Sequence, residues 1–324
     1  MWVRRVRIGK DALAWDFLYS PTPFTHYTHL TRLTFSVIFR EHFPIGPKTT
    51  MRIGGTVRYY AELKTREDCQ EAVVFAAEKN IPLIPLGSGS NMIFADGEVN
   101  ALVVQLRHDT VVIDGNSVTV GCGKNLPMLI NELAAKDLDL SALTGIPGTV
   151  GGALFGNAGQ GPKGVWIDSF VHSVTAFMDG AWHMMDRENC TFSYRESKFK
   201  HSDTPVILFE TTFIIPSGDP VTIKQSIEDL LKKRIDTQPH VRTAGSCFKA
   251  VGDVPAWKLI DAANLRGTKI GDIEIAQKHA NFLLNTGKAT YADAKKIVEL
   301  VKEKITERLD VEMRFVEENG SLAF

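Results

Sequence analysis

Two glycine-rich stretches carry the residue types that cradle phosphate groups. The first is Gly87-Ser88-Gly89-Ser90-Asn91, and the second runs from Gly145 to Gly159. Because glycine has no Cβ, successive backbone N–H groups can turn toward anionic oxygens and approach them closely. Neither stretch fits GxGxxG or the P-loop pattern, so both standard nucleotide motifs are excluded. The residues alone therefore predict a dinucleotide or nucleotide-sugar site, with a pair of tight turns as the alternative.

The histidines and cysteines predict no metal site. The histidine pair at His26 and His29 lacks a carboxylate or a third ligand. No CxxC pair or zinc-finger spacing is formed by the four cysteines, which are Cys69, Cys122, Cys190 and Cys247. Such isolated cysteines are typical of reduced thiols in a cytoplasmic protein.

Composition excludes several classes of partner. The chain has 324 residues with 37 Lys and Arg against 38 Asp and Glu, a formal net charge of −1. A protein that reads a nucleic-acid backbone needs a basic excess, so nucleic acid is not expected as a partner. The apolar run Leu33–Phe39 is too short to span a bilayer, and no signal peptide follows the first arginines. We expect a cytoplasmic protein that does not bind membranes.

The glycine loops are predicted to lie in a strand-rich module. A capping pair at Thr65 and Asp68 predicts a helix, which is followed by a short apolar strand, Ile81–Leu86, leading into the first loop. Further strands include a hairpin around Asp114-Gly115-Asn116 and the β-rich run Val206–Ile215. Helical patterns also cover 126–136 and dominate after residue 216, with a second capping pair at Thr290 and Asp293.

Six ordered blocks give a specific resemblance. They read IPLGSGSNMIFADG, LTGIPGTVGGALFGNAGQ, FSYRESKF, QPHVRTAGSCFK, KHANFLLNTGKAT and LDVEMRF, between about Thr49 and Phe315. Together they resemble the UDP-N-acetylenolpyruvoylglucosamine reductase family, in its compact type without an extra substrate-covering loop. The resemblance implies an α+β fold, with a two-lobed FAD-binding domain of the vanillyl-alcohol-oxidase type and a C-terminal α+β substrate domain. We accordingly expect an N-terminal extension (1–45), the FAD-binding domain (46–215, lobes split near 95) and the substrate domain (216–324).

The same resemblance implies the chemistry. NADPH would reduce FAD, and the enolpyruvyl group of UDP-N-acetylglucosamine enolpyruvate would then be reduced to give UDP-N-acetylmuramate for peptidoglycan. FAD is expected to be non-covalent, because neither loop holds a suitable His or Cys. The residues expected to bind FAD are Gly87, Ser88, Gly89, Ser90, Asn91, Gly145, Ile146, Pro147, Gly148, Thr149, Gly151, Gly152, Asn157, Ala158 and Gly159. The resemblance leaves the oligomeric state open.

By block match, three residues carry catalysis. Arg195 is the charge stabiliser, Ser246 the proton donor to C2, and Glu312 the acidic group that works with them, while Tyr194 and Lys249 are expected to bind substrate. Each has a structural alternative. Arg195 would be a surface residue paired with the adjacent glutamate, Ser246 a turn serine, and Glu312 part of a solvated strand face. The neighbouring cysteine at position 247 is interpreted as packing, because no base is evident near it.

The chain departs from the family pattern at three places in the substrate domain. The usual Asn-Pro, Gly-Ala and Ser-Glu pairs are replaced by Ala250-Val251, Asp272-Ile273 and Ala276-Gln277. We expect these changes to affect substrate affinity more than the type of reaction. Two other functions remain as alternatives, an FAD-dependent oxidase of the same fold and a non-catalytic flavin or nucleotide-sugar binder.

Overall fold

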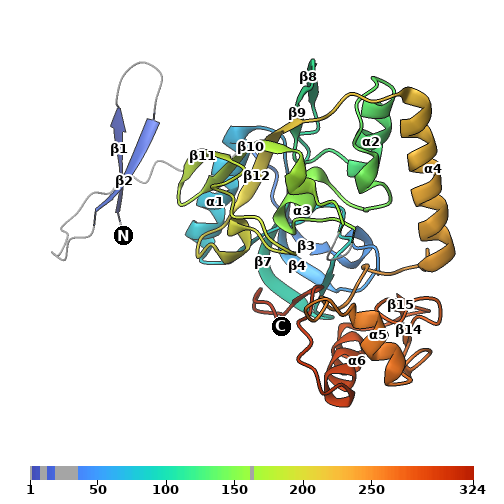
Figure 1. Cartoon of the computed structure of the whole chain (residues 1–324). Coiled ribbons are helices and arrows are strands. Elements are labelled where there is room, and N and C mark those ends of the chain that lie inside the picture. Colours follow the sequence, from blue (N-terminus) through green and yellow to red (C-terminus); the bar gives the residue numbers. More distant parts are fainter. Residues whose placement is uncertain (1, 8–12, 19–35, 161–163) are drawn as a thin grey trace.

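The first glycine loop is positioned by a mixed sheet with the strand order β3-β4-β7-β5. The computed structural model describes residues 2–7, 13–18, 36–160 and 164–324. Strand β4 (Thr56–Leu63) runs parallel to β7 (Glu98–Leu106), with β5 (Leu83–Pro85) parallel and β3 (Arg40–Pro44) antiparallel at the edges. Helix α1 (Arg66–Lys79) packs on this sheet and begins at the predicted capping box. Strands β4 and β7 lie side by side in Figure 1, and the loop follows β5 after a single residue, Leu86.

The second glycine loop belongs to an antiparallel sheet with the order β11-β10-β12-β9-β8. The predicted hairpin is confirmed as β8 and β9, and β12 matches the predicted β-rich run. Helices α2 and α3 pack beside this sheet. The bounds are β8 (Val111–Asp114), β9 (Ser117–Gly121), β10 (Val171–Met178), β11 (Ala181–Asp186), β12 (Ile207–Ile214), α2 (Leu126–Ala134) and α3 (Val150–Phe155).

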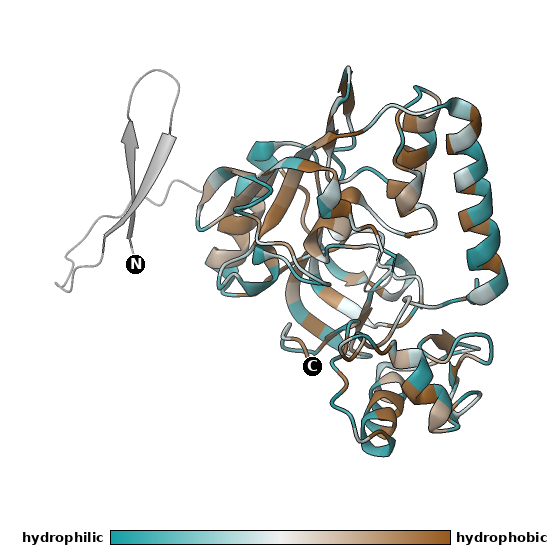
Figure 2. Cartoon of the chain, viewed as in Figure 1, coloured by the Kyte–Doolittle hydropathy of each residue, from teal (hydrophilic) through white to brown (hydrophobic). Residues whose placement is uncertain are grey.

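The sheets can be compared with the lobe and domain limits expected from sequence, which stay predictions. The expected split between lobes lies near residue 95, whereas β7 belongs to the first sheet and the chain changes sheets between Leu106 and Val111. The segment expected to open the substrate domain is α4 (Pro220–Thr237). Its buried Ile223 and Ile227 pack with the core of the second sheet, and its outer face is largely hydrophilic (Figure 2). The apolar side of α4 is thus buried against the second sheet and not within the C-terminal part.

The C-terminal part combines two helices with a small antiparallel sheet of order β13-β14-β15. Helix α6 begins at the second predicted capping box, formed by Thr290 and Asp293. After α6 the chain returns to the first lobe, where β16 (Arg314–Val316) pairs in parallel with β6 (Met92–Phe94). The remaining bounds are α5 (Ala256–Ala262), α6 (Tyr291–Lys304), β13 (Lys269–Ile270), β14 (Ile273–Ile275) and β15 (Leu283–Asn285).

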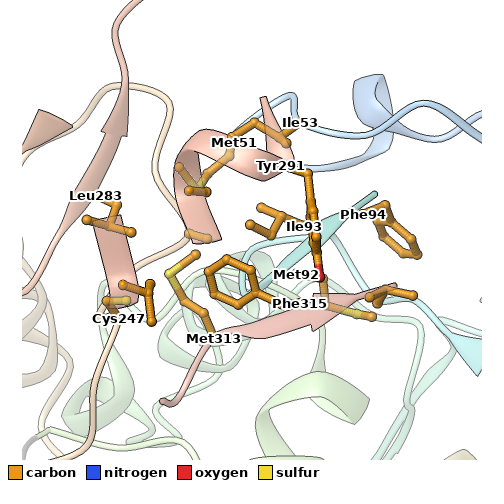
Figure 3. Packing of buried hydrophobic residues seen from close by; sticks show 14 of the residues in the cluster. Met51, Ile53, Met92, Ile93, Phe94, Cys247, Leu283, Tyr291, Met313 and Phe315 are labelled. Carbon is orange, nitrogen blue, oxygen red and sulfur yellow. The ribbon is translucent and has the colours of Figure 1, made fainter. Parts of the chain in front are cut away.

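This return builds one core from both ends of the chain. Phe94 and Phe315 are almost fully buried in the same cluster as Cys247 and Leu283, and Figure 3 shows this cluster extending from Leu283 and Cys247 on one side to Phe94 on the other. Each large apolar side chain that is fully buried stabilises the folded state by about 1.5–3 kcal/mol. Because strand β6 follows the first glycine loop directly, this core also fixes that loop against the C-terminal part.

Shorter elements complete the described chain. Strands β1 (Trp2–Arg7) and β2 (Leu13–Leu18) pair antiparallel, whereas the histidine pair at 26 and 29 lies outside the described residues. No helix within the described ranges is long and apolar enough to cross a membrane. The 3-10 helices are η1 (Gly46–Lys48), η2 (Ser141–Leu143), η3 (Ile167–Ser169) and η4 (Lys198–His201).

Candidate active site

Both glycine loops line one cavity of about 670 Å³. They also contact each other, because the Ser90 hydroxyl donates to the Pro147 carbonyl at 3.4 Å. Gly87 faces Thr149 closely enough that a Cβ there would lie 2.7 Å from the threonine hydroxyl oxygen. The two loops predicted from glycine content alone are therefore two walls of a single site.

The first loop offers free backbone donors to a ligand. Gly89 has φ +66°, and a Cβ at this position would lie 2.2 Å from the Lys48 carbonyl oxygen, so only glycine fits without a shift. Within the part of the chain that the structure describes, no group accepts a hydrogen bond from the backbone N–H of Ser88, Gly89 or Ser90. Successive unpartnered N–H groups beside a cavity suit the oxygens of a pyrophosphate.

The second loop divides into residues that line the cavity and residues that support it. The predicted FAD-binding residues on its wall are Ile146, Pro147, Gly148, Thr149, Gly151, Gly152, Ala158 and Gly159. Gly145 and Asn157 are not among the lining residues. Gly145 packs against the Arg234 side chain. Asn157 is fully buried, and its side-chain amide donates to the Ser193 carbonyl at 2.9 Å.

Three segments far apart in the chain bring the predicted catalytic side chains to this cavity. Arg195, Ser246 and Glu312 all line it, and Arg195 Nε lies 2.9 Å from Glu312 Oε1 in an ion pair. The alternative pairing of Arg195 with its neighbour is not observed, because Glu196 instead contacts Lys249 and His201. The surface positions that the alternatives gave to Arg195 and Glu312 are not observed, because their side chains are 16% and 17% exposed.

Glu312 is held in a mostly enclosed position. Its side chain is 17% exposed, and burial raises its pKa, while the nearby Arg195, Lys200 and Lys249 act in the opposite direction. Its backbone is fixed twice, since Glu312 N donates to the Cys247 carbonyl at 2.8 Å and its own carbonyl accepts from Asn91 Nδ2 at 3.0 Å. A residue of the first glycine loop thus anchors the backbone of Glu312.

The segment that carries Ser246 is fixed by Asn281. The amide of Asn281 accepts from Phe248 N at 2.9 Å and donates to the Phe248 carbonyl at 2.8 Å. Cys247 is 1% exposed, and burial raises its pKa, which fits packing rather than a nucleophile. Ser246 itself stays partly exposed to the cavity.

The two predicted substrate residues lie on the same wall. The Tyr194 hydroxyl accepts from Ala250 N at 3.3 Å, and Lys249 forms an ion pair with Glu196. Among the residues that differ from the family pattern, Ala250 is the one that lines this cavity within the described chain.

Sequence reasoning missed three cations of the cavity. Lys200, Arg234 and Arg314 line it together with Arg195 and Lys249, against the carboxylates Glu196 and Glu312. Burial lowers the pKa values of Lys200, Arg234 and Arg314. Their sequence context gave no signal, because a lysine or arginine among polar residues is normally solvated. The excess of positive charge suits an anionic ligand.

Comparison with known proteins decides the family. A curated UDP-N-acetylenolpyruvoylglucosamine reductase from Moorella thermoacetica is 36% identical over 286 residues, covering 87% of this chain and 93% of that protein. The chain belongs to the UDP-N-acetylenolpyruvoylglucosamine reductase family. A second reductase of this name, from Rubrobacter xylanophilus, is 33% identical over 89% of this chain and 96% of its own length.

Domain and structural matches agree with this assignment. The sequence model of the UDP-N-acetylenolpyruvoylglucosamine reductase C-terminal domain matches residues 238–315, and that of an FAD binding domain matches residues 57–181. The crystal structure of UDP-N-acetylenolpyruvylglucosamine reductase from Thermus caldophilus superposes with a TM-score of 0.76 at 29% identity, covering 86% of this chain and 99% of that one.

The chain is therefore an FAD-dependent oxidoreductase with the predicted α+β architecture. The cavity fits the cofactor, because the first loop supplies unpartnered N–H groups for a diphosphate and the glycines leave the backbone open to close approach. The individual FAD contacts remain predictions, as do the domain limits.

Proposed function

We propose that this enzyme reduces the enolpyruvyl group of UDP-N-acetylglucosamine enolpyruvate to give UDP-N-acetylmuramate, a peptidoglycan precursor, in the cytoplasm. NADPH is the proposed reductant and FAD the proposed non-covalent carrier, which supplies hydride to the substrate when bound. The observation that carries this proposal is the meeting of Arg195, Ser246 and Glu312 at the cavity that both glycine loops line. The names of the relatives at 36% and 33% identity support the choice of substrate.

The proposed roles follow from charge. Hydride addition to C3 of the substrate leaves negative charge that spreads onto its carboxylate. The planar guanidinium of Arg195, fixed by Glu312 at 2.9 Å, suits that carboxylate. One preorganised donor directed at the developing charge lowers the activation free energy by about 3 kcal/mol.

The second step is a proton transfer to C2. Ser246 is the proposed donor, which then takes its proton back through the neighbouring polar groups of the site. A serine is a weak acid and needs a partner. We propose Glu312, whose pKa is raised by burial, as the nearby group that helps to balance the charge during this proton transfer. Lys249 and Tyr194 are proposed to hold the nucleotide diphosphate.

Anaerobic stopped-flow absorbance tests the proposal. The flavin is first reduced with NADPH and then mixed with UDP-N-acetylglucosamine enolpyruvate. Rapid return of the oxidised flavin spectrum is expected. Reoxidation by oxygen but not by this substrate would indicate the oxidase instead. A purified protein without flavin would contradict the proposed binding of FAD by the two glycine loops.

A further inference from the structure

The backbone that carries Arg195 has an unfavourable conformation. Ser193 and Glu196 exchange both backbone hydrogen bonds, each 3.1 Å, which leaves Tyr194 and Arg195 as the two turn residues. Arg195 has φ +59°, in the left-handed region. A non-glycine residue there costs about 1–2 kcal/mol, so the surroundings must hold it.

One side of this turn is fixed by the second glycine loop. Asn157 Nδ2 donates to the Ser193 carbonyl at 2.9 Å, and Arg195 Nη2 donates to the Gly159 carbonyl at 3.2 Å. These bonds fix the entry to the turn and the far end of the arginine side chain. In the peptide that leaves Arg195, the N–H of Glu196 is bonded within the turn to Ser193, but neither of these two bonds reaches the Arg195 carbonyl.

The other side is fixed by Lys200. Its ammonium group donates to the carbonyl oxygen of Arg195 from η4, one turn further along the chain. The side chain is 21% exposed and lies 4.0 Å from Glu196, so a charged donor is kept beside the turn. A hydrogen bond from a charged donor is about twice as strong as a neutral one.

We propose that Lys200 is a positioning residue, which holds Arg195 in its left-handed conformation so that the guanidinium meets Glu312 and the substrate carboxylate. This inference rests on the proposed function. Without the lysine donor, Arg195 would relax toward a commoner φ and its side chain would leave the ion pair. Misplacement of a catalytic group by about 1 Å costs about 100-fold in rate.

Lys200 also lines the cavity, so direct binding of the anionic substrate is the competing explanation. A double-mutant cycle separates the two. The rate of flavin reoxidation by UDP-N-acetylglucosamine enolpyruvate, and the substrate Kd, are measured for Lys200→Met in the Arg195 and Arg195→Gln backgrounds. Lys198→Met, an exposed lysine of the same 3-10 helix, is the matched control.

If Lys200 acts through Arg195, Lys200→Met slows reoxidation about 100-fold in the Arg195 background but less than about 3-fold once Arg195 is replaced. The Kd changes less than about 3-fold in both. Equal slowing in the two backgrounds, a change confined to Kd, or a wild-type rate in Lys200→Met would each overturn the inference. A Lys200→Met variant that does not retain FAD is replaced in the cycle by Lys200→Gln, with the same expectations. Failure of the wild-type enzyme to react would instead refute the proposed function.

Discussion

At the residue scale, the site depends on pairings that spacing in the sequence does not reveal. Arg195 and Glu312 form their ion pair across more than a hundred residues, whereas the adjacent Glu196 is the partner that sequence proximity favours. The family resemblance selected side chains that the fold brings to one cavity, but their contacts could be read only from the fold. The partly buried cations Lys200 and Arg234 were missed because nothing in a run of polar residues marks one of them as facing a cavity.

Replacing Ser246 tests the proton donor. Ser246→Ala should leave flavin reduction by NADPH unchanged and slow reoxidation by substrate by about 100-fold or more, because only the second half-reaction needs a proton at C2. Stopped-flow absorbance resolves the two steps. Cys247→Ala is the control, because the Cys247 side chain is buried in the core. This variant should lose a little stability but keep both rate constants. Equal slowing of both steps by Ser246→Ala would contradict its role.

Replacing Glu312 tests the pH dependence. Burial raises its pKa, so the carboxyl keeps its proton to a higher pH than an ordinary glutamate does. If the protonated form supports the reaction, reoxidation should slow as pH rises through that raised pKa. Glu312→Gln, which stays neutral at every pH, should lose this alkaline limb while reacting about 100-fold more slowly overall. A pH profile of the single-turnover rate decides, and an unchanged alkaline limb in the variant would assign it to another group.

At the element scale, the sequence predicted those features that depend only on neighbouring residues, such as helix starts and tight turns. Both capping boxes start helices at the predicted residues, and the Asp-Gly-Asn turn forms the predicted hairpin. The packing partner of α4 was not predictable, because an amphipathic stripe shows that a helix is buried on one face but not against what. In the structure, Ile223 and Ile227 of α4 pack in the core of the second sheet.

The first glycine loop gives a prediction with a matched control. Gly89→Ala should weaken FAD binding and lower the free energy of unfolding by at least about 2 kcal/mol, because φ +66° is retained only with a Cβ 2.2 Å from a carbonyl oxygen. Gly115→Ala, at φ +56° with no atom within 4 Å of the added Cβ, should lose only about 1 kcal/mol and keep its flavin. Flavin fluorescence titration and urea unfolding compare them. Equal flavin affinity in both variants would show that the close packing of Gly89 does not shape the site.

At the scale of the whole molecule, the C-terminal part and the first lobe are one structural unit. Asp96 of the first lobe accepts hydrogen bonds from Tyr291 N at 2.8 Å and Ala292 N at 3.3 Å, the first turn of α6. The largest core cluster also draws residues from both regions. No local pattern predicts such contacts, because they join positions about two hundred residues apart in the chain.

The Asp96 contact gives a test of this unit. Asp96→Ala should lower the free energy of unfolding by about 1 kcal/mol, because two N–H groups at the start of α6 lose a charged acceptor. Asp203→Ala, an exposed aspartate in a loop of the second lobe, should leave it unchanged. Urea unfolding followed by circular dichroism measures both. Identical stability of the two variants would show that water replaces the Asp96 contact without loss.

The parallel pairing of β16 with β6 has a consequence for synthesis in the cell. Residues 314–316 leave the ribosome last among the elements of the core, long after the strand that they complete. Until they emerge, strand β6 lacks its parallel neighbour, and Ile93 and Phe94 lack the β16 side chains that help to bury them. A chain synthesised only as far as residue 313 therefore already holds both glycine loops, but the strand that follows the first loop is not yet covered.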